Sequence, residues 1–129
     1  MDFSGPEPIY LQIAQDIREQ ILAGVLCAGD QVMSTTEYAT TYRINPATAA
    51  KAFSILEAEG IVYKQRGIGV FVASGAYQML LARRQATFES DVVRPFANDI
   101  VQLGLDVEEV LDAVREAVAT RQGSIEERL

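Results

Sequence analysis

The chain has no histidine and a single cysteine, Cys27, among its 129 residues. One cysteine cannot form an intramolecular disulfide, and without histidine or a cysteine pair the sequence shows no metal-ligand cluster and no nucleophile–base arrangement. Its carboxylates fall mostly on the surfaces of predicted helices, where solvation accounts for them. The sequence therefore predicts neither an enzyme nor a bound metal or cofactor.

Long apolar runs are also missing. No stretch approaches the roughly 18 apolar residues that a membrane span requires. The N-terminus, residues 1–6, lacks the basic and apolar regions of a signal peptide. These features predict a cytoplasmic protein with no membrane contact, and the length suits one domain with a smaller appendage.

A four-residue spacing of isoleucines predicts an amphipathic first helix that begins near Pro8 and stops at Gly24. The turn after it carries Val25 and Leu26, which are expected to tuck under the domain. The spaced residues of this helix are Ile9, Ile13, Ile17 and Ile21.

Capping residues mark the starts of two further helices. Ser34 offers an N-cap oxygen, and Glu37 completes a capping box for a short helix that ends near Tyr42. Asn45 suits the cap of the next helix, and Pro46 takes its first position, where a missing N–H does no harm.

The helix that begins at Pro46 has two unlike sides on a 3.6-residue wheel. One side is predicted to be core. On the other side, the residues of the first two turns are small apart from Lys51, which could reach a phosphate or a guanine edge in a groove about 12 Å wide. A solvated face with one lysine is the alternative. The core side holds Ala49, Ala52, Phe53 and Leu56, and the outer side holds Ala47, Thr48, Lys51, Ser54 and Ile55.

Gly60 ends that helix, and residues 61–63 and 70–72 are rich in β-branched and aromatic types, which predicts paired strands. The turn at 66–69 has two glycines, which allow positive φ and close backbone approach, while Arg66 could lie along a minor groove. Helix, turn, helix and hairpin in this order predict a winged helix-turn-helix DNA-binding domain, mostly α with a small β-hairpin.

Positive charge is scarce for such a domain. Eleven basic against 18 acidic residues give a net charge of −7, and residues 1–75 and 76–129 are each acidic. Arg43, Lys51, Lys64 and Arg66 nevertheless fall in or beside the predicted DNA-reading elements. We expect modest, salt-dependent affinity per subunit, which favours a dimer.

The composition turns helical after Gly75, so a DNA-binding domain at 1–75 is followed by a helical region at 76–129. One apolar stripe runs to about Gly104, and Pro95 within it favours a kink or a restart of the helix. Asp106 with Glu109 caps a final helix. A solvated tail is expected from Gln122.

Two helices cannot bury both of their apolar stripes alone, so packing against a twin subunit is expected, with folding back onto the chain's own DNA-binding domain as the alternative. The residues predicted to make the dimer contact are Leu81, Phe88, Val92, Phe96, Ile100, Leu103, Val110, Leu111 and Val114.

The motifs at residues 8–73 resemble, in order and spacing, the DNA-binding domain of GntR-family bacterial transcription regulators. The short C-terminal part resembles the YtrA-like branch, which carries a small helical dimerisation region in place of a large effector domain. The motifs are residues 8–13 (PIYLQI), Ile17, Ile21, Gly24, Gly29, Asp30, Ser34, Glu37, Ala39, residues 44–46 (INP), Thr48, residues 51–53 (KAF), Leu56, residues 59–61 (EGI) and residues 67–72 (GIGVFV).

The resemblance implies a repressor-like regulator that binds an inverted-repeat operator in double-stranded DNA as a homodimer. The helix at 46–59 would enter the major groove and the hairpin tip at 66–69 the minor groove. The DNA contacts it implies are Ser34, Thr36, Asn45, Ala47, Thr48, Lys51, Arg66, Gly67 and Gly69.

The chain departs from the family pattern at several of these positions. Thr36 and Ala50 stand where the family often has basic residues, Met33 where proline is common, and Ile68 where a polar residue is usual.

A small-molecule effector of unknown identity, held between the helical region and the DNA-binding domain, would act by changing the distance between two recognition helices. A winged helix that binds protein is the alternative that the acidic charge leaves open.

Overall fold

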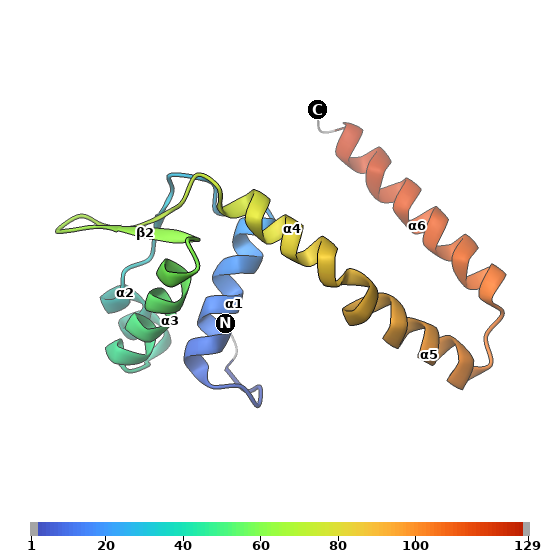
Figure 1. Cartoon of the computed structure of the whole chain (residues 1–129), viewed down its shortest axis with the longest axis horizontal. Helices are drawn as coiled ribbons and strands as arrows, with labels where there is room; N and C mark the ends of the chain where they lie inside the picture. Colours follow the sequence, from blue (N-terminus) through green and yellow to red (C-terminus); the bar gives the residue numbers. More distant parts are fainter. Residues whose placement is uncertain (1–2, 128–129) are drawn as a thin grey trace. The chain divides into compact units, whose positions relative to one another are not determined.

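The computed structural model describes residues 3–127, and Figure 1 shows the order of the elements along the chain. The chain divides into two compact units, Met1–Gln85 and Ala86–Leu129. This division falls inside α4 (Ala76–Phe88), later than residue 75, because Ala76 and Leu80 are buried in the core of the first unit. Within residues 3–127, each helix is too short or too polar to span a bilayer.

The core of the first unit forms where α1 (Ile9–Leu22) packs on α3 (Pro46–Ala58). The isoleucine spacing lines one side of α1, which is why Ile13 and Ile17 have no exposed surface. The predicted core side of α3 is confirmed, since Ala49, Ala52, Phe53 and Leu56 are all buried.

Local hydrogen bonds fix the starts of α2 (Thr35–Tyr42) and α3 at the predicted residues. Ser34 Oγ accepts a hydrogen bond from the Glu37 amide at 3.1 Å. Asn45 Oδ1 accepts one from the Ala47 amide at 2.9 Å. Each cap satisfies an amide that the first turn of a helix leaves without a partner.

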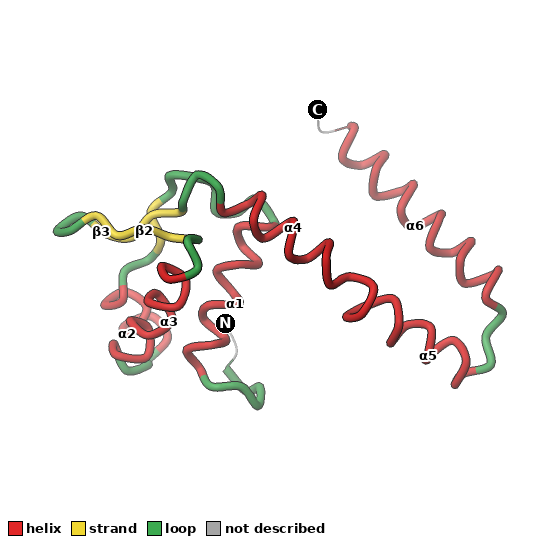
Figure 2. The backbone as a smooth tube through the Cα atoms, viewed as in Figure 1, coloured by secondary structure: helices red, strands yellow, loops and turns green. Residues whose placement is uncertain are grey.

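Three antiparallel strands form a small sheet in the order β1-β3-β2. They are β1 (Gln31–Val32), β2 (Val62–Gln65) and β3 (Gly69–Val72). The β2–β3 hairpin was predicted and projects from the helices, as Figure 2 shows. The sequence did not indicate β1, because two residues are too few to display the alternation of a strand.

The turn after α1 differs in part from the expectation. Leu26 packs against the core, but Val25 is 67% exposed. Gly24 adopts a left-handed conformation (φ 78°) at the end of α1, and the Val25 side chain that follows it lies in solvent.

The segment around Pro95, where a kink or a restart was expected, stays helical, since Val93 and Arg94 both have right-handed helical dihedrals. α4 passes into a π-helical turn, η1 (Glu89–Val93), and α5 (Arg94–Leu103) begins directly after it with Pro95 in its first turn. Proline lacks an amide hydrogen and its ring crowds the carbonyl one turn earlier, and the wider π-helical turn relieves both effects.

The last helix, α6 (Val107–Glu127), is longer than predicted. It starts at the expected cap, where Asp106 Oδ1 accepts a hydrogen bond from the Glu108 amide at 2.8 Å. Gln122 and Ser124 of the expected solvated tail are exposed, but the helix continues through them to Glu127, because the segment has no proline and Gly123 disfavours a helix by only about 1 kcal/mol. Residues 128–129 of that tail lie outside the described residues.

Glu59, which follows α3, binds arginines from two other helices of the first unit. Its Oε1 accepts a hydrogen bond from Arg18 Nη2 of α1 at 2.6 Å, and its Oε2 accepts one from Arg83 Nη1 of α4 at 3.0 Å. Burial raises the pKa of this carboxyl, but the hydrogen bonds and charges of Arg18 and Arg83 outweigh burial and hold the pKa below its ordinary 4.5. The carboxylate therefore links α1, α3 and α4.

Leu56→Ala should lower the free energy of unfolding by about 2–5 kcal/mol, because it removes a fully buried side chain and leaves a cavity. Urea denaturation followed by circular dichroism measures the change. Val25→Ala, at an exposed position of the same unit, is the control and should shift stability by less than about 0.5 kcal/mol. Equal losses in the two variants would contradict the placement of Leu56 in the core.

The Glu59 contacts should make stability depend on pH. Because the folded-state pKa lies below 4.5, the carboxylate stabilises the fold above that pH and loses this effect as pH falls through the lowered pKa. Glu59→Gln should therefore be less stable than the wild type at pH 7, with the difference shrinking below about pH 4.5. Melting temperatures from pH 7 to pH 3 test this, and a difference that is constant over the range would contradict it.

Candidate nucleic-acid interface

The outer side of α3 is a narrow surface of mostly small side chains. Ser54 Oγ donates a hydrogen bond to the Ala50 carbonyl at 3.0 Å, which holds the hydroxyl close to the helix. Ile55, predicted to lie outside, is half-buried. Another molecule can thus approach the α3 backbone closely along this side. Its exposed or half-buried residues are Ala47, Thr48, Ala50, Lys51 and Ser54.

The hairpin tip, called the wing here (residues 66–69), depends on its glycines. Gly67 and Gly69 have φ values of 78° and 150°, which side chains disfavour. Gln31 Nε2 of β1 donates a hydrogen bond to the Ile68 carbonyl at 3.2 Å and occupies the space that a side chain at Gly69 would need. The wing thus leaves Arg66 and Ile68 exposed while its backbone is held by β1.

A groove of about 340 Å³ joins α2, α3 and the hairpin. Ser34 borders it from the start of α2, Ala50 and Ser54 from α3, and Lys64 with the two wing glycines from the hairpin. Predicted site residues from distant parts of the sequence therefore lie on one surface. Ser54 and Lys64 belong to it as well, although neither was among the predicted contacts.

The remaining predicted contacts on the helices do not border the groove itself, as far as the structure describes the chain. They occupy exposed or half-buried positions at the start of α2 and in the caps and first turns of α3: Thr36, Asn45, Ala47, Thr48 and Lys51. The Asn45 side chain is already engaged as the α3 cap.

Lys51 makes a contact that the sequence did not indicate. Its Nζ lies 4.0 Å from the centre of the Tyr10 ring, within the range of a cation–π interaction. Tyr10 lies in the first turn of α1 and is half-buried, so one end of this contact is anchored. The ring favours one position of the Lys51 side chain and leaves its charge at the surface.

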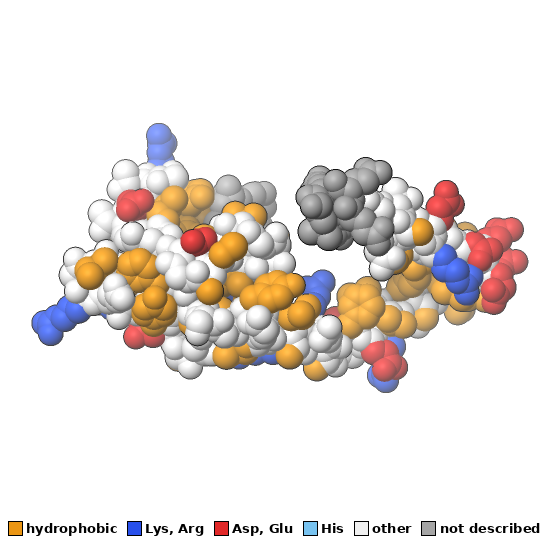
Figure 3. Space-filling model, turned by 90° about the horizontal axis from the view of Figure 1, so that it is seen from above, with side chains coloured by type: hydrophobic (Ala, Val, Ile, Leu, Met, Phe, Trp, Pro, Cys, Tyr) orange, Lys and Arg blue, Asp and Glu red, His pale blue; other side chains and the backbone are white. Residues whose placement is uncertain are grey.

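Four cations on or near this surface have no ion-pair partner among the side chains that the structure describes: Arg43, Lys51, Lys64 and Arg66. Arg43 stands in the left-handed conformation (φ 55°) that ends α2. On the face seen in Figure 3, positive side chains of the first unit project singly and do not form a broad patch. The cations are therefore spread singly over this surface, and the acidic Glu57 borders the same groove as Lys64.

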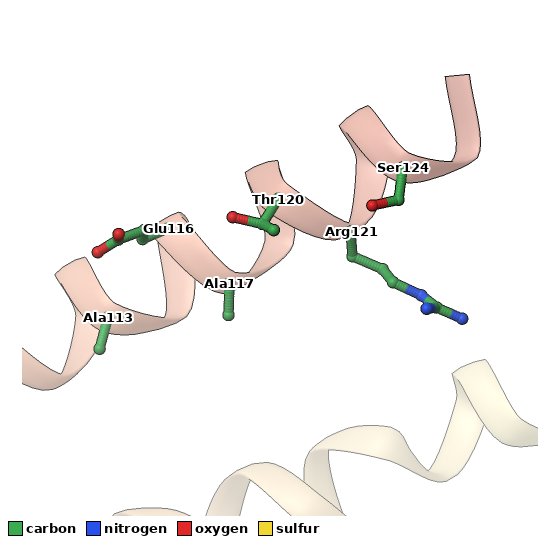
Figure 4. Close-up of a pocket in the computed structure, with 6 residues that line it drawn as sticks. All are labelled: Ala113, Glu116, Ala117, Thr120, Arg121 and Ser124. Carbon is green, nitrogen blue, oxygen red and sulfur yellow. The ribbon is translucent and has the colours of Figure 1, made fainter. Parts of the chain in front are cut away.

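Two other hollows on the chain differ from a typical effector site. One, of about 210 Å³, lies between the end of α1, β3 and the start of α4, and it is smaller than the roughly 300 Å³ of typical small-molecule sites. The other, of about 530 Å³, is lined by one side of α6 alone, with Glu116, Thr120 and Arg121 among its residues (Figure 4). Neither converges polar groups around an enclosed space, so the effector stays a prediction.

Comparison with known proteins agrees with this geometry. Residues 9–72 match the family described as bacterial regulatory proteins, gntR family. The chain is 34% identical to the uncharacterized HTH-type transcriptional regulator YhcF of Bacillus subtilis (strain 168), over 88% of this chain and 92% of that protein. It is 32% identical to the HTH-type transcriptional repressor YtrA of the same organism, over 90% of this chain and 88% of that protein.

Solved structures extend the likeness to the fold. A transcriptional regulator from Oenococcus oeni is 28% identical and superposes with a TM-score of 0.70, over 92% of this chain and 97% of that one. The DNA-binding domain of AraR in complex with operator ORX1 is 27% identical with a TM-score of 0.52, over 56% of this chain and 93% of that one.

The family match spans the helix-turn-helix and the hairpin, and the two relatives extend the likeness through the C-terminal helices. These relatives are regulators and not enzymes, in agreement with the sequence. The chain belongs to the GntR family of bacterial regulatory proteins and is a DNA-binding transcription regulator of the YtrA type.

Proposed function

We propose that this chain is a repressor that binds an inverted-repeat operator as a homodimer, with α3 in the major groove and the wing in the minor groove. The observation that carries the proposal is the surface on which α3 and the wing meet, near which lie cations without ionic partners among the described side chains. The repressor name of the YtrA relative and the operator complex of the AraR domain support it.

The side chains of α3 suit a major groove. Ala47, Ala50 and Ser54 are small, so the helix backbone can come close to base edges in a groove about 12 Å wide. Lys51 is the one long cationic side chain, and its contact with the Tyr10 ring favours one position of it. Because Thr36 and Ala50 carry no charge, recognition relies on fewer phosphate or guanine contacts than a basic helix would make.

The wing suits a minor groove for a different reason. Its glycines have no side chain and so allow a close approach of the backbone, and Arg66 supplies a charge that the narrow groove attracts. Ile68 is 65% exposed at the tip, where an apolar side chain can contact sugars or wedge against a base step.

The C-terminal helices leave an apolar surface that a second copy can cover. Of the nine residues predicted for the dimer contact, none is buried within the chain. Phe88, Phe96 and Leu103 are among the large apolar side chains that remain exposed. Figure 3 shows such apolar surface next to acidic side chains near the passage from α5 to α6. Contiguous apolar surface of this kind marks a protein–protein contact.

Lys51→Ala should weaken DNA binding by roughly 10-fold and lower the salt slope of log Kd by about 1, because one phosphate or guanine contact is lost. The probes are duplexes that the full-length chain selects from a random library, and fluorescence anisotropy at several salt concentrations measures Kd. Lys51→Arg keeps the charge and is the control. An unchanged affinity of Lys51→Ala for the selected duplexes would contradict the placement of α3 in the major groove. Binding of a protein partner, without salt-dependent DNA binding, would favour the protein-interaction alternative.

Phe96→Asp should convert the dimer to a monomer, because it places a charge in the apolar stripe of α5. Asn98→Asp adds the same charge at an exposed position on the opposite side of α5 and should remain dimeric. Sedimentation equilibrium measures both masses. A monomeric wild type, or equal behaviour of the two variants, would rule out a homodimer built on this stripe.

A further inference from the structure

The Arg18–Glu59–Arg83 cluster joins the helix proposed to read DNA to the helix that leads out of the DNA-binding unit. Glu59 caps the C-terminal end of α3, and its side chain is 25% exposed. Arg18 contacts both of its oxygens, with Nη2 at 2.6 Å from Oε1 and Nε at 3.3 Å from Oε2. The carboxylate is thus already fixed by α1 when Arg83 binds it.

The contact with Arg83 lies beside the apolar contacts that hold α4. Ala76 and Leu80 are buried in the core, and Met79 Cε lies 3.7 Å from the position that a Cβ on Gly60 would take. Leu80 and Arg83 are three residues apart, so they lie on the same side of α4. Apolar packing thus holds the first two turns of α4, and the ion pair holds the next turn against the end of α3.

We propose that the Glu59–Arg83 ion pair sets the direction in which α4 leaves the DNA-binding unit, and so selects the operator half-site spacing that the homodimer accepts. This inference rests on the proposed function, because spacing has meaning only for a dimer on two half-sites. Glu59 and Arg83 are positioning residues and touch no DNA in this scheme.

Simple geometry shows why one ion pair is enough. α4 has 13 residues and is therefore about 20 Å long. A change of about 10° in its direction moves its far end by about 3.5 Å, close to the rise of one base pair in B-DNA. Two recognition helices bind together only when their separation matches the half-sites. A small angular freedom at Arg83 would thus blur the choice between spacers that differ by one base pair.

The energetics suit a positioning role better than a stabilising one. Arg83 is half-exposed, and an exposed ion pair adds little to stability. The Glu59–Arg83 pair forms more easily because Arg18 already immobilises the Glu59 carboxylate, so less side-chain entropy is lost when Arg83 binds. The pair therefore acts mainly on geometry.

The test measures how affinity depends on spacer length. The full-length chain first selects a bipartite site from random duplexes, and a series of duplexes is then made with one or two base pairs added to or removed from the spacer. Kd is measured on this series, and on a duplex with one half-site, for the wild type, Glu59→Gln, Arg83→Gln and the double variant. Arg84→Gln is the matched control, since Arg84 is an exposed neighbour on the same helix with no ion pair among the described side chains.

The wild type and Arg84→Gln should lose at least about 10-fold in affinity when the spacer changes by one base pair, because simultaneous engagement is lost. Glu59→Gln and Arg83→Gln should discriminate by less than about 3-fold, the double variant should match them, and single half-site affinity should not change.

Two results would overturn the inference alone. They are a variant spacer profile equal to that of the wild type, and a uniform loss at every spacer and on the single half-site, which indicates a merely structural role. Selection of single half-sites by a monomeric wild type would instead overturn the proposed homodimer, and this inference with it.

Discussion

The burial of one side of α3 against α1 is the constraint on which the interface depends. Ala49 and Ala52 have no exposed surface and present only methyl groups, so the two helices pack closely around Ile13 and Ile17. Because successive residues of a helix are rotated by 100° about its axis, the residues that are buried on one side of α3 also determine which residues are exposed on the other side. The core thus decides which residues can face DNA before any DNA is present.

Eight of the 11 arginines and lysines fall into two groups with different physical roles. Arg18, Arg83, Arg94 and Arg115 form ion pairs with carboxylates, and the first two tie helices of the first unit together. The cations near α3 and the wing have no such partner among the described side chains. Net charge alone is therefore a poor guide to this surface, because it does not say where on the chain the cations and the carboxylates lie.

Features set by local sequence could be predicted, and features set by distant pairs could not. The caps at Ser34, Asn45 and Asp106 were read correctly because each bonds an amide two or three residues away. The contacts of Gln31 with the wing and of Tyr10 with Lys51 join residues about 40 positions apart, which no spacing rule reveals. For the same reason, the sequence predicted that the helix starting at Pro46 and the hairpin tip contact DNA, but it did not predict the groove that lies between these two elements.

In the proposed homodimer, a surface with few cations makes the relative position of the two halves decisive. When each half binds weakly, tight binding requires both halves at once, and linked binding is lost once their separation no longer fits. In such a regulator, a change in the arrangement of the two halves that prevents both from binding at once removes the contribution of one half to operator affinity. The contacts proposed to set the direction of α4 would therefore control binding while the residues proposed to contact the bases stay the same.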